Sequence, residues 1–128
     1  MEKQKSIRVA ELILKENEFI RLVLNNNIDI EPKDISEILV ESNKLAEGKE
    51  YFMLTDARTN VQASKEAREY AAKTPLSKNI LANAILVDSL AVALLANFYT
   101  NFDKPQMLTR VFNSEKKATE WLMALMKK

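Results

Sequence analysis

Short apolar runs that resemble strands alternate with helix-like segments along the chain, and this alternation limits the fold more than any other feature. The expected strands cover residues 7–15, 19–25, 51–57, 84–87 and 106–112. The expected helices cover residues 32–47, 63–73 and 89–102, and the segment from residue 114 to the end. The order ββαβαβαβα predicts an opening antiparallel hairpin followed by right-handed parallel crossovers.

We therefore expect an α/β fold: a mixed β-sheet of about five strands with four helices. The 128 residues suit one compact domain, residues 1–128, because a chain of this length can bury its own core. Pro32 suits the first helical position, and Gly48 suits the stop that follows that helix.

The composition excludes several kinds of chemistry. The chain has no cysteine and no histidine, so thiolate catalysis, a serine–histidine–acid triad and a histidine zinc site cannot be built. Gly48 is the single glycine, which rules out glycine-rich phosphate loops. A net charge of +1 argues against nucleic acid as a partner. We expect no enzymatic activity, no metal and no cofactor.

The first candidate site is the segment from Asp56 to Arg58, directly after the third expected strand. Ligands of open α/β sheets bind at the carboxyl ends of strands, and Arg58 or Arg68 would hold a phosphate or carboxylate through its planar fork. The alternative, which the sequence favours, is that Asp56 accepts backbone N–H bonds in the loop and pairs with an arginine.

Two serines stand near the expected starts of helices. Ser64 precedes the second helix and Ser89 the third, where a serine commonly caps the first turn. A helix N-terminus also favours an added phosphate, so Ser64 is a phosphorylation candidate as well as a capping residue.

The third expected helix carries the remaining candidates. Residues 90–96, which include Leu94, are apolar around the whole helical circumference, so part of this helix must be covered. The cover is the domain's own core, a second subunit, an apolar ligand or a membrane surface. An apolar pocket between the second and third helices would be lined by aromatic residues, with polar groups for orientation; otherwise the same residues form an ordinary core. These residues are Arg68, Tyr70, Leu76, Asn97, Phe98, Tyr99, Phe102 and Met107.

Three stretches resemble the STAS fold, and more closely its SpoIIAA-like, or STAS/SEC14, group. They are "YFMLTDAR" in the central strand, "AILVDSLAVALLANFY" in the fourth strand and third helix, and "RVFNSEKKATEWL" near the end. The resemblance implies the fold described above. STAS antagonists carry a phosphorylatable serine at the start of the helix after the central strand, and Ser64 in "TNVQASKEA" falls at that place without the family's glycines. The SpoIIAA-like group implies binding of apolar ligands or contact with membranes.

We therefore expect a non-enzymatic regulatory or binding module that acts through protein–protein contact, as a homodimer or with another protein. The expected contact face joins the second and third helices to the loop after Asp56. The alternative is binding of a lipid-like molecule, or peripheral membrane association, through the same two helices. The longest apolar run, residues 90–96, is far shorter than the roughly 20 residues of a membrane span, and the first residues lack a signal-peptide pattern. The cytoplasm is the expected location.

Overall fold

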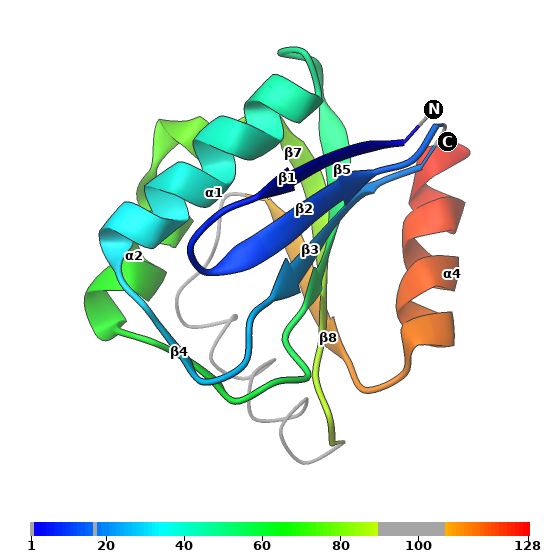
Figure 1. Ribbon diagram of the computed structural model, residues 1–128. Helices are drawn as coiled ribbons and strands as arrows, with labels where there is room; N and C mark the ends of the chain where they lie inside the picture. Colours follow the sequence, from blue (N-terminus) through cyan, green and yellow to red (C-terminus); the bar gives the residue numbers. More distant parts are fainter. Residues whose placement is uncertain (1, 17, 90–106) are drawn as a thin grey trace.

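The structure is a computed structural model that describes residues 2–16, 18–89 and 107–128 (Figure 1). In these ranges the chain forms a mixed α/β domain of eight strands and three α-helices, with one short 3₁₀-helix. The strands are β1 (Lys3–Ser6), β2 (Ala10–Leu14), β3 (Ile20–Leu24), β4 (Ile28–Ile30), β5 (Tyr51–Asp56), β6 (Val61–Ala63), β7 (Ile80–Leu86) and β8 (Leu108–Phe112). The helices are α1 (Pro32–Leu45), α2 (Lys65–Lys73), the 3₁₀-helix η1 (Pro75–Ser77) and α4 (Glu115–Met126).

Six of the strands form one sheet in the order β1-β2-β3-β5-β7-β8. The first three strands pair antiparallel, whereas β3-β5, β5-β7 and β7-β8 are parallel. A separate parallel pair, β4-β6, lies beside the starts of α1 and α2 (Figure 1). The main sheet is therefore mixed, as predicted, with β5 in its interior.

Helices cover the two faces of the sheet differently. The helices α1 and α2 lie on one face, and α4 lies on the other (Figure 1). A large cluster that includes Leu12, Ile38 and Met53 fills the α1 side. A smaller cluster packs Leu54 against Leu122 of α4. Because successive strand residues point to opposite faces, Met53 packs in the cluster on the α1 side and Leu54 in the cluster on the α4 side.

Local sequence signals explain where α1 begins and ends. Pro32 occupies the first turn, and Glu31 and Asp34 form a reciprocal capping box. Past the last turn, Gly48 adopts a φ of 77°, a left-handed conformation that glycine tolerates without strain. The Gly48 N–H donates to the Asn43 carbonyl (3.0 Å), which satisfies one carbonyl of the helix end.

The predicted number of elements is wrong, although the fold class is right. The structure adds β1, β4 and β6 to the five predicted strands. The sequence of β1, KQKS, is polar because this edge strand is mostly exposed, so it carries no alternating apolar signal. The strands β4 and β6 have three residues each, too few for a pattern. The predicted helix 89–102 lies outside the described residues, except for Ser89 at its start.

Candidate functional site

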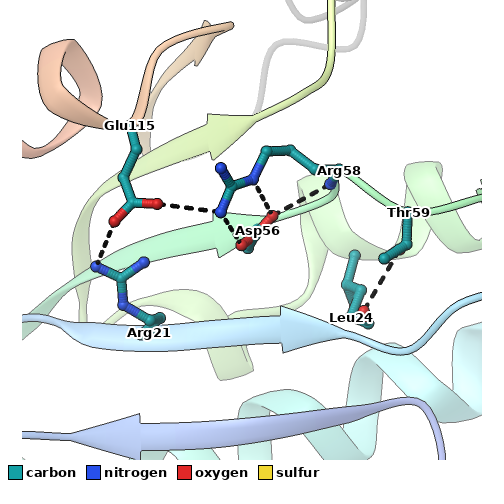
Figure 2. A network of polar contacts seen from close by, with 6 residues as sticks. All are labelled: Arg21, Leu24, Asp56, Arg58, Thr59 and Glu115. Carbon is teal, nitrogen blue, oxygen red and sulfur yellow. Dashed lines mark hydrogen bonds and ion pairs between the residues drawn. The ribbon is translucent and has the colours of Figure 1, made fainter.

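Four charged side chains meet where β5 ends beside the start of α4 (Figure 2). Asp56 and Arg58 come from the end of β5 and the loop after it, Arg21 comes from β3, and Glu115 opens α4. We call these four residues the strand-end cluster. Residues far apart in sequence thus meet at the carboxyl edge of the parallel strands, where α/β sheets commonly bind ligands.

Arg58 is the centre of the strand-end cluster. Its Nε and Nη2 donate to the two oxygens of Asp56 at 3.0 and 2.8 Å, a bidentate pair. The same Nη2 donates to Glu115 Oε1 at 3.0 Å, and Arg21 Nη2 lies 3.6 Å from the other Glu115 oxygen. Two cations therefore alternate with two carboxylates, and each charge has a partner of opposite sign.

Asp56 also closes the turn that follows β5. Its Oδ1 accepts the backbone N–H of Arg58 at 3.2 Å, two residues along the chain. The prediction that Asp56 accepts a loop N–H and pairs with an arginine is confirmed. A hydrogen bond from Arg58 is the main reason that the pKa of Asp56 is lowered, and this outweighs the opposing effect of burial.

The electrostatics of the strand-end cluster do not suit proton transfer. A general base near neutral pH needs a pKa close to that pH, whereas Asp56 has a lowered pKa and is already ionised. The hydrogen bond to Asp56 raises the pKa of Arg58 further, so the guanidinium keeps its proton. The strand-end cluster instead holds the loop that follows β5 against the start of α4.

The loop after Arg58 is fastened to the turn after β3. The Thr59 hydroxyl lies 3.4 and 3.3 Å from the carbonyl oxygens of Leu24 and Asn25 (Figure 2 shows the first). Asn60 donates its backbone N–H to Asn26 Oδ1 at 3.0 Å and its side-chain amide to Asn27 Oδ1 at 2.9 Å. These bonds explain the run of asparagines as turn residues that hold the loop in place.

The predicted residues on α2 lie on the other side of the sheet. Ser64 caps α2, and its hydroxyl accepts the Ala67 N–H at 3.0 Å, as the capping prediction required. Arg68 is exposed. Hydrogen bonds with Thr74 and Ser36 lower the pKa of the half-buried Tyr70.

The structure therefore divides the predicted contact face. Asp56 and Arg58 face the α4 side, whereas Ser64, Arg68 and Tyr70 belong to α2 on the α1 side (Figure 1). The other predicted site residues lie outside the described part of the chain. They are Leu94, Asn97, Phe98, Tyr99 and Phe102.

An open groove runs along the end of α2. Its volume is about 590 Å³, and its lining combines apolar side chains with charged ones. Tyr70 and Leu76, both predicted to line a pocket, contribute to it, together with Glu66, Glu69 and Lys73 at the rim. The groove is a surface feature that would hold part of a ligand or one side chain of a partner.

Sequence reasoning missed Arg21 and Glu115 as members of the strand-end cluster. Glu115 had one local signal, because it follows the capping residue Ser114 at the start of a helix. Arg21 had none, since its place depends on the parallel pairing of β3 with β5, in which it stands opposite Leu54.

In the described ranges no three His, Cys, Asp or Glu side chains are grouped so as to hold a metal ion. No helix in the same ranges is long and apolar enough to cross a membrane.

Comparison with known proteins bears on the fold. The family model DUF7793, described as a domain of unknown function, matches residues 13–126. Among solved structures, the chain is similar to an uncharacterized protein of the DUF3478 family from Shewanella loihica PV-4, which has a SpoIIAA-like fold. The TM-score is 0.62 at 14% identity, and the match covers 92% of this chain and 98% of that one. The predicted SpoIIAA-like fold is thus confirmed. No curated protein matches the chain.

Proposed function

We infer that this chain, which belongs to the DUF7793 family and has a SpoIIAA-like fold, is a non-enzymatic module that acts by binding another protein. The observation that carries this proposal is the open groove at the end of α2, beside Tyr70 and Leu76. Sites that turn over small molecules usually enclose most of the ligand, whereas an open groove with a charged rim suits a side chain of a protein partner.

The strand-end cluster supports binding over catalysis. Its cations and carboxylates are already paired with one another, so none of the four is poised to attack a substrate or to take its proton. In this proposal the strand-end cluster keeps the segment 57–63, which ends in β6, in a fixed position before α2.

The proposed contact surface consists of α2, its groove and the loop that leads to Ser64. Exposed charges surround the groove: Glu66, Glu69 and Lys73 on α2, with Arg68 one turn after Ser64. A polar rim around a few apolar side chains is the usual anatomy of a non-obligate interface. A phosphate on Ser64 would add negative charge at the N-terminus of α2, where such charge is favoured, and would change the charge of this surface, which would give the contact a regulatory input.

A second candidate function rests on the same groove. A volume of about 590 Å³ falls within the range of small-molecule sites, and Tyr70, Pro75 and Leu76 supply apolar surface. An apolar small molecule would then occupy the groove in place of a partner's side chain. The two candidates differ in what co-purifies with the protein.

Native mass spectrometry of the purified full chain separates the two candidates. A mass increase of a few hundred daltons would favour the small molecule, whereas a dimer or a complex with a second protein would favour the proposal. A partner captured from the native host would then be purified and its affinity measured with Glu69→Lys at the groove rim. We expect about a tenfold loss for this variant, since charge reversal at a contact costs roughly that factor.

The matched control is Glu18→Lys, which makes the same charge change on the exposed turn before β3. We expect it to bind the partner with unchanged affinity. Equal loss in both variants would indicate a non-specific charge effect. A bound apolar molecule with no protein complex would contradict the proposal.

A further inference from the structure

A second surface, on the α4 side of the sheet, combines exposed apolar and cationic side chains. The strand β8 is the last strand of the main sheet, and its alternate residues Leu108, Arg110 and Phe112 share the face that α4 covers. Phe112 contacts Trp121 of α4, with ring centroids 5.6 Å apart and planes tilted by 52°. We call Leu108, Arg110, Phe112, Lys117 and Trp121 the edge patch.

Exposure distinguishes the edge patch from a buried core. Leu108 is 56% exposed, more than the other exposed large hydrophobic residue that the structure describes, Leu81 at 42%. Phe112 and Trp121 are half-buried. A single exposed leucine needs no explanation, but this one lies on the same strand face as an aromatic pair, so apolar side chains stand on either side of Arg110 along β8.

Arg110 adds a second feature of binding surfaces. Its guanidinium lies over the Phe112 ring, 5.2 Å from the ring centre, so the aromatic face holds the cation in place while it stays exposed to solvent. Arginine and tryptophan are the residue types that contribute most often to the energetic centres of protein interfaces. The stack of Arg110, Phe112 and Trp121 is therefore a preformed anchor rather than three separate side chains.

The charge of the edge patch indicates what would bind there. Lys117 lies one helical turn before Trp121 and is exposed, so it stands on the same side of α4. In the described part of the chain, no ion pair joins Arg110 or Lys117 to an acidic side chain. Glu120 is three residues after Lys117, a spacing at which helix side chains are neighbours, so it offsets part of the Lys117 charge, whereas β8 has no acidic residue beside Arg110. The edge patch is thus cationic as well as apolar.

We propose that the edge patch docks an acidic segment of a partner protein, with carboxylates on Arg110 and Lys117 and an apolar side chain against Leu108 and Phe112. This inference rests on the proposed function as a protein-binding module, but it uses the sheet face opposite to α2. Complementary charge sets the orientation of such a contact, and the apolar side chain supplies desolvated area at its centre.

Two other occupants fit the edge patch less well. A second copy of the chain would place the same patch against itself in a symmetric contact, which would bring two copies of Arg110 and Lys117 into one interface instead of supplying carboxylates for them. An anionic membrane needs a larger basic cluster or a deeply inserted apolar helix face, whereas the edge patch offers two cations and half-buried aromatic rings.

Trp121 allows a direct test because it is the only tryptophan in the chain. The probe is a synthetic peptide in which Asp and Glu flank one Leu and one Phe, titrated into the full chain while Trp121 fluorescence is followed. We expect a saturable change that weakens as salt is added. A peptide with Lys in place of each acidic residue is the matched probe, and we expect it not to bind.

Variants locate the contact. Arg110→Glu and Leu108→Ala change exposed side chains, so both proteins should fold, which circular dichroism would verify. We expect each to weaken binding of the acidic peptide about tenfold, the effect of losing one important contact. Lys65→Glu on α2 makes a charge reversal on the opposite face, and its affinity should equal that of the wild type.

Each remaining outcome overturns the inference. No fluorescence change with the acidic peptide, or an equal response to the basic one, would contradict the proposed chemistry. A dimer that dissociates on Leu108→Ala, or binding only to phosphatidylserine vesicles, would assign the edge patch to another occupant. The α2 variant Glu69→Lys should leave peptide binding unchanged, so this test and the test of the α2 groove fail independently.

Discussion

Removing the Asp56 carboxylate tests whether the strand-end cluster is a structural junction. Asp56→Ala deletes the bidentate pair with Arg58 and the bond to the Arg58 N–H. Hydrogen bonds to charged groups contribute about 1.5–3 kcal/mol, but solvent screens this pair because the Arg58 side chain is 41% exposed. We therefore expect the free energy of unfolding to fall by about 1 kcal/mol.

The measurement is urea-induced unfolding of the full chain at neutral pH, in low and high salt. Glu115→Ala should lower the free energy of unfolding by no more than about 0.5 kcal/mol, because both partners of the Arg58–Glu115 ion pair are substantially exposed. The control Asp29→Ala removes an exposed carboxylate on β4 and should change stability by less than about 0.5 kcal/mol. A double-mutant cycle with Arg58→Ala isolates the pair itself.

The sign of the pH dependence follows from the lowered pKa of Asp56. Its stabilising contribution is present above the carboxyl pKa of the unfolded chain, about 3.9, and is lost as the pH falls through the lower folded value. The difference between wild type and Asp56→Ala should therefore shrink in acid. The reasoning would be refuted if Asp56→Ala lowered the free energy of unfolding equally in the wild type and in Arg58→Ala. It would also be refuted if the stability difference between wild type and Asp56→Ala grew as the pH fell.

Three further substitutions test other parts of the structure by chemical unfolding. Asp34→Ala removes a buried carboxylate that accepts two hydrogen bonds from Arg8 and caps α1, so stability should fall by about 2 kcal/mol; a loss below about 0.5 kcal/mol would contradict this. Ser64→Ala should cost about 1 kcal/mol and speed hydrogen exchange at the Ala67 amide, whereas Ser64→Thr should retain most of the cap. Tyr51→Phe should leave stability within about 0.5 kcal/mol or raise it, because the buried hydroxyl makes no hydrogen bond of good geometry, although it interacts with the Ser42 hydroxyl; a clear loss would show that the Ser42 interaction stabilises the fold.

Part of the candidate site was predictable because its contacts are local in sequence. Asp56 and Arg58 are two residues apart, and a strand followed by a turn brings an aspartate to its own loop N–H. Ser64 was predictable as a cap because a helix-like pattern begins directly after it. Glu115 and Arg21 were not, because they reach Arg58 and each other only after α4 and β3 have packed around β5.

The sequence by itself determined the elements whose periodicity or end signals lie within one segment: the hairpin of β2 and β3, the helices α1 and α4, and the strand β5. It determined the fold class too, since alternating strands and helices require parallel crossovers. It did not reveal β1, because this exposed edge strand is polar and lacks the alternating apolar residues by which a strand is recognised.

Tertiary structure decided which residues share a surface. Asp56 and Ser64 are eight positions apart, yet the crossover sends α2 back over the α1 face while Asp56 points to α4. The same packing placed Arg110, Phe112 and Trp121 together at the sheet edge. Sequence patterns say whether a side chain is buried, but the side of the sheet on which each helix lies depends on contacts between distant segments, and those form only in the folded chain.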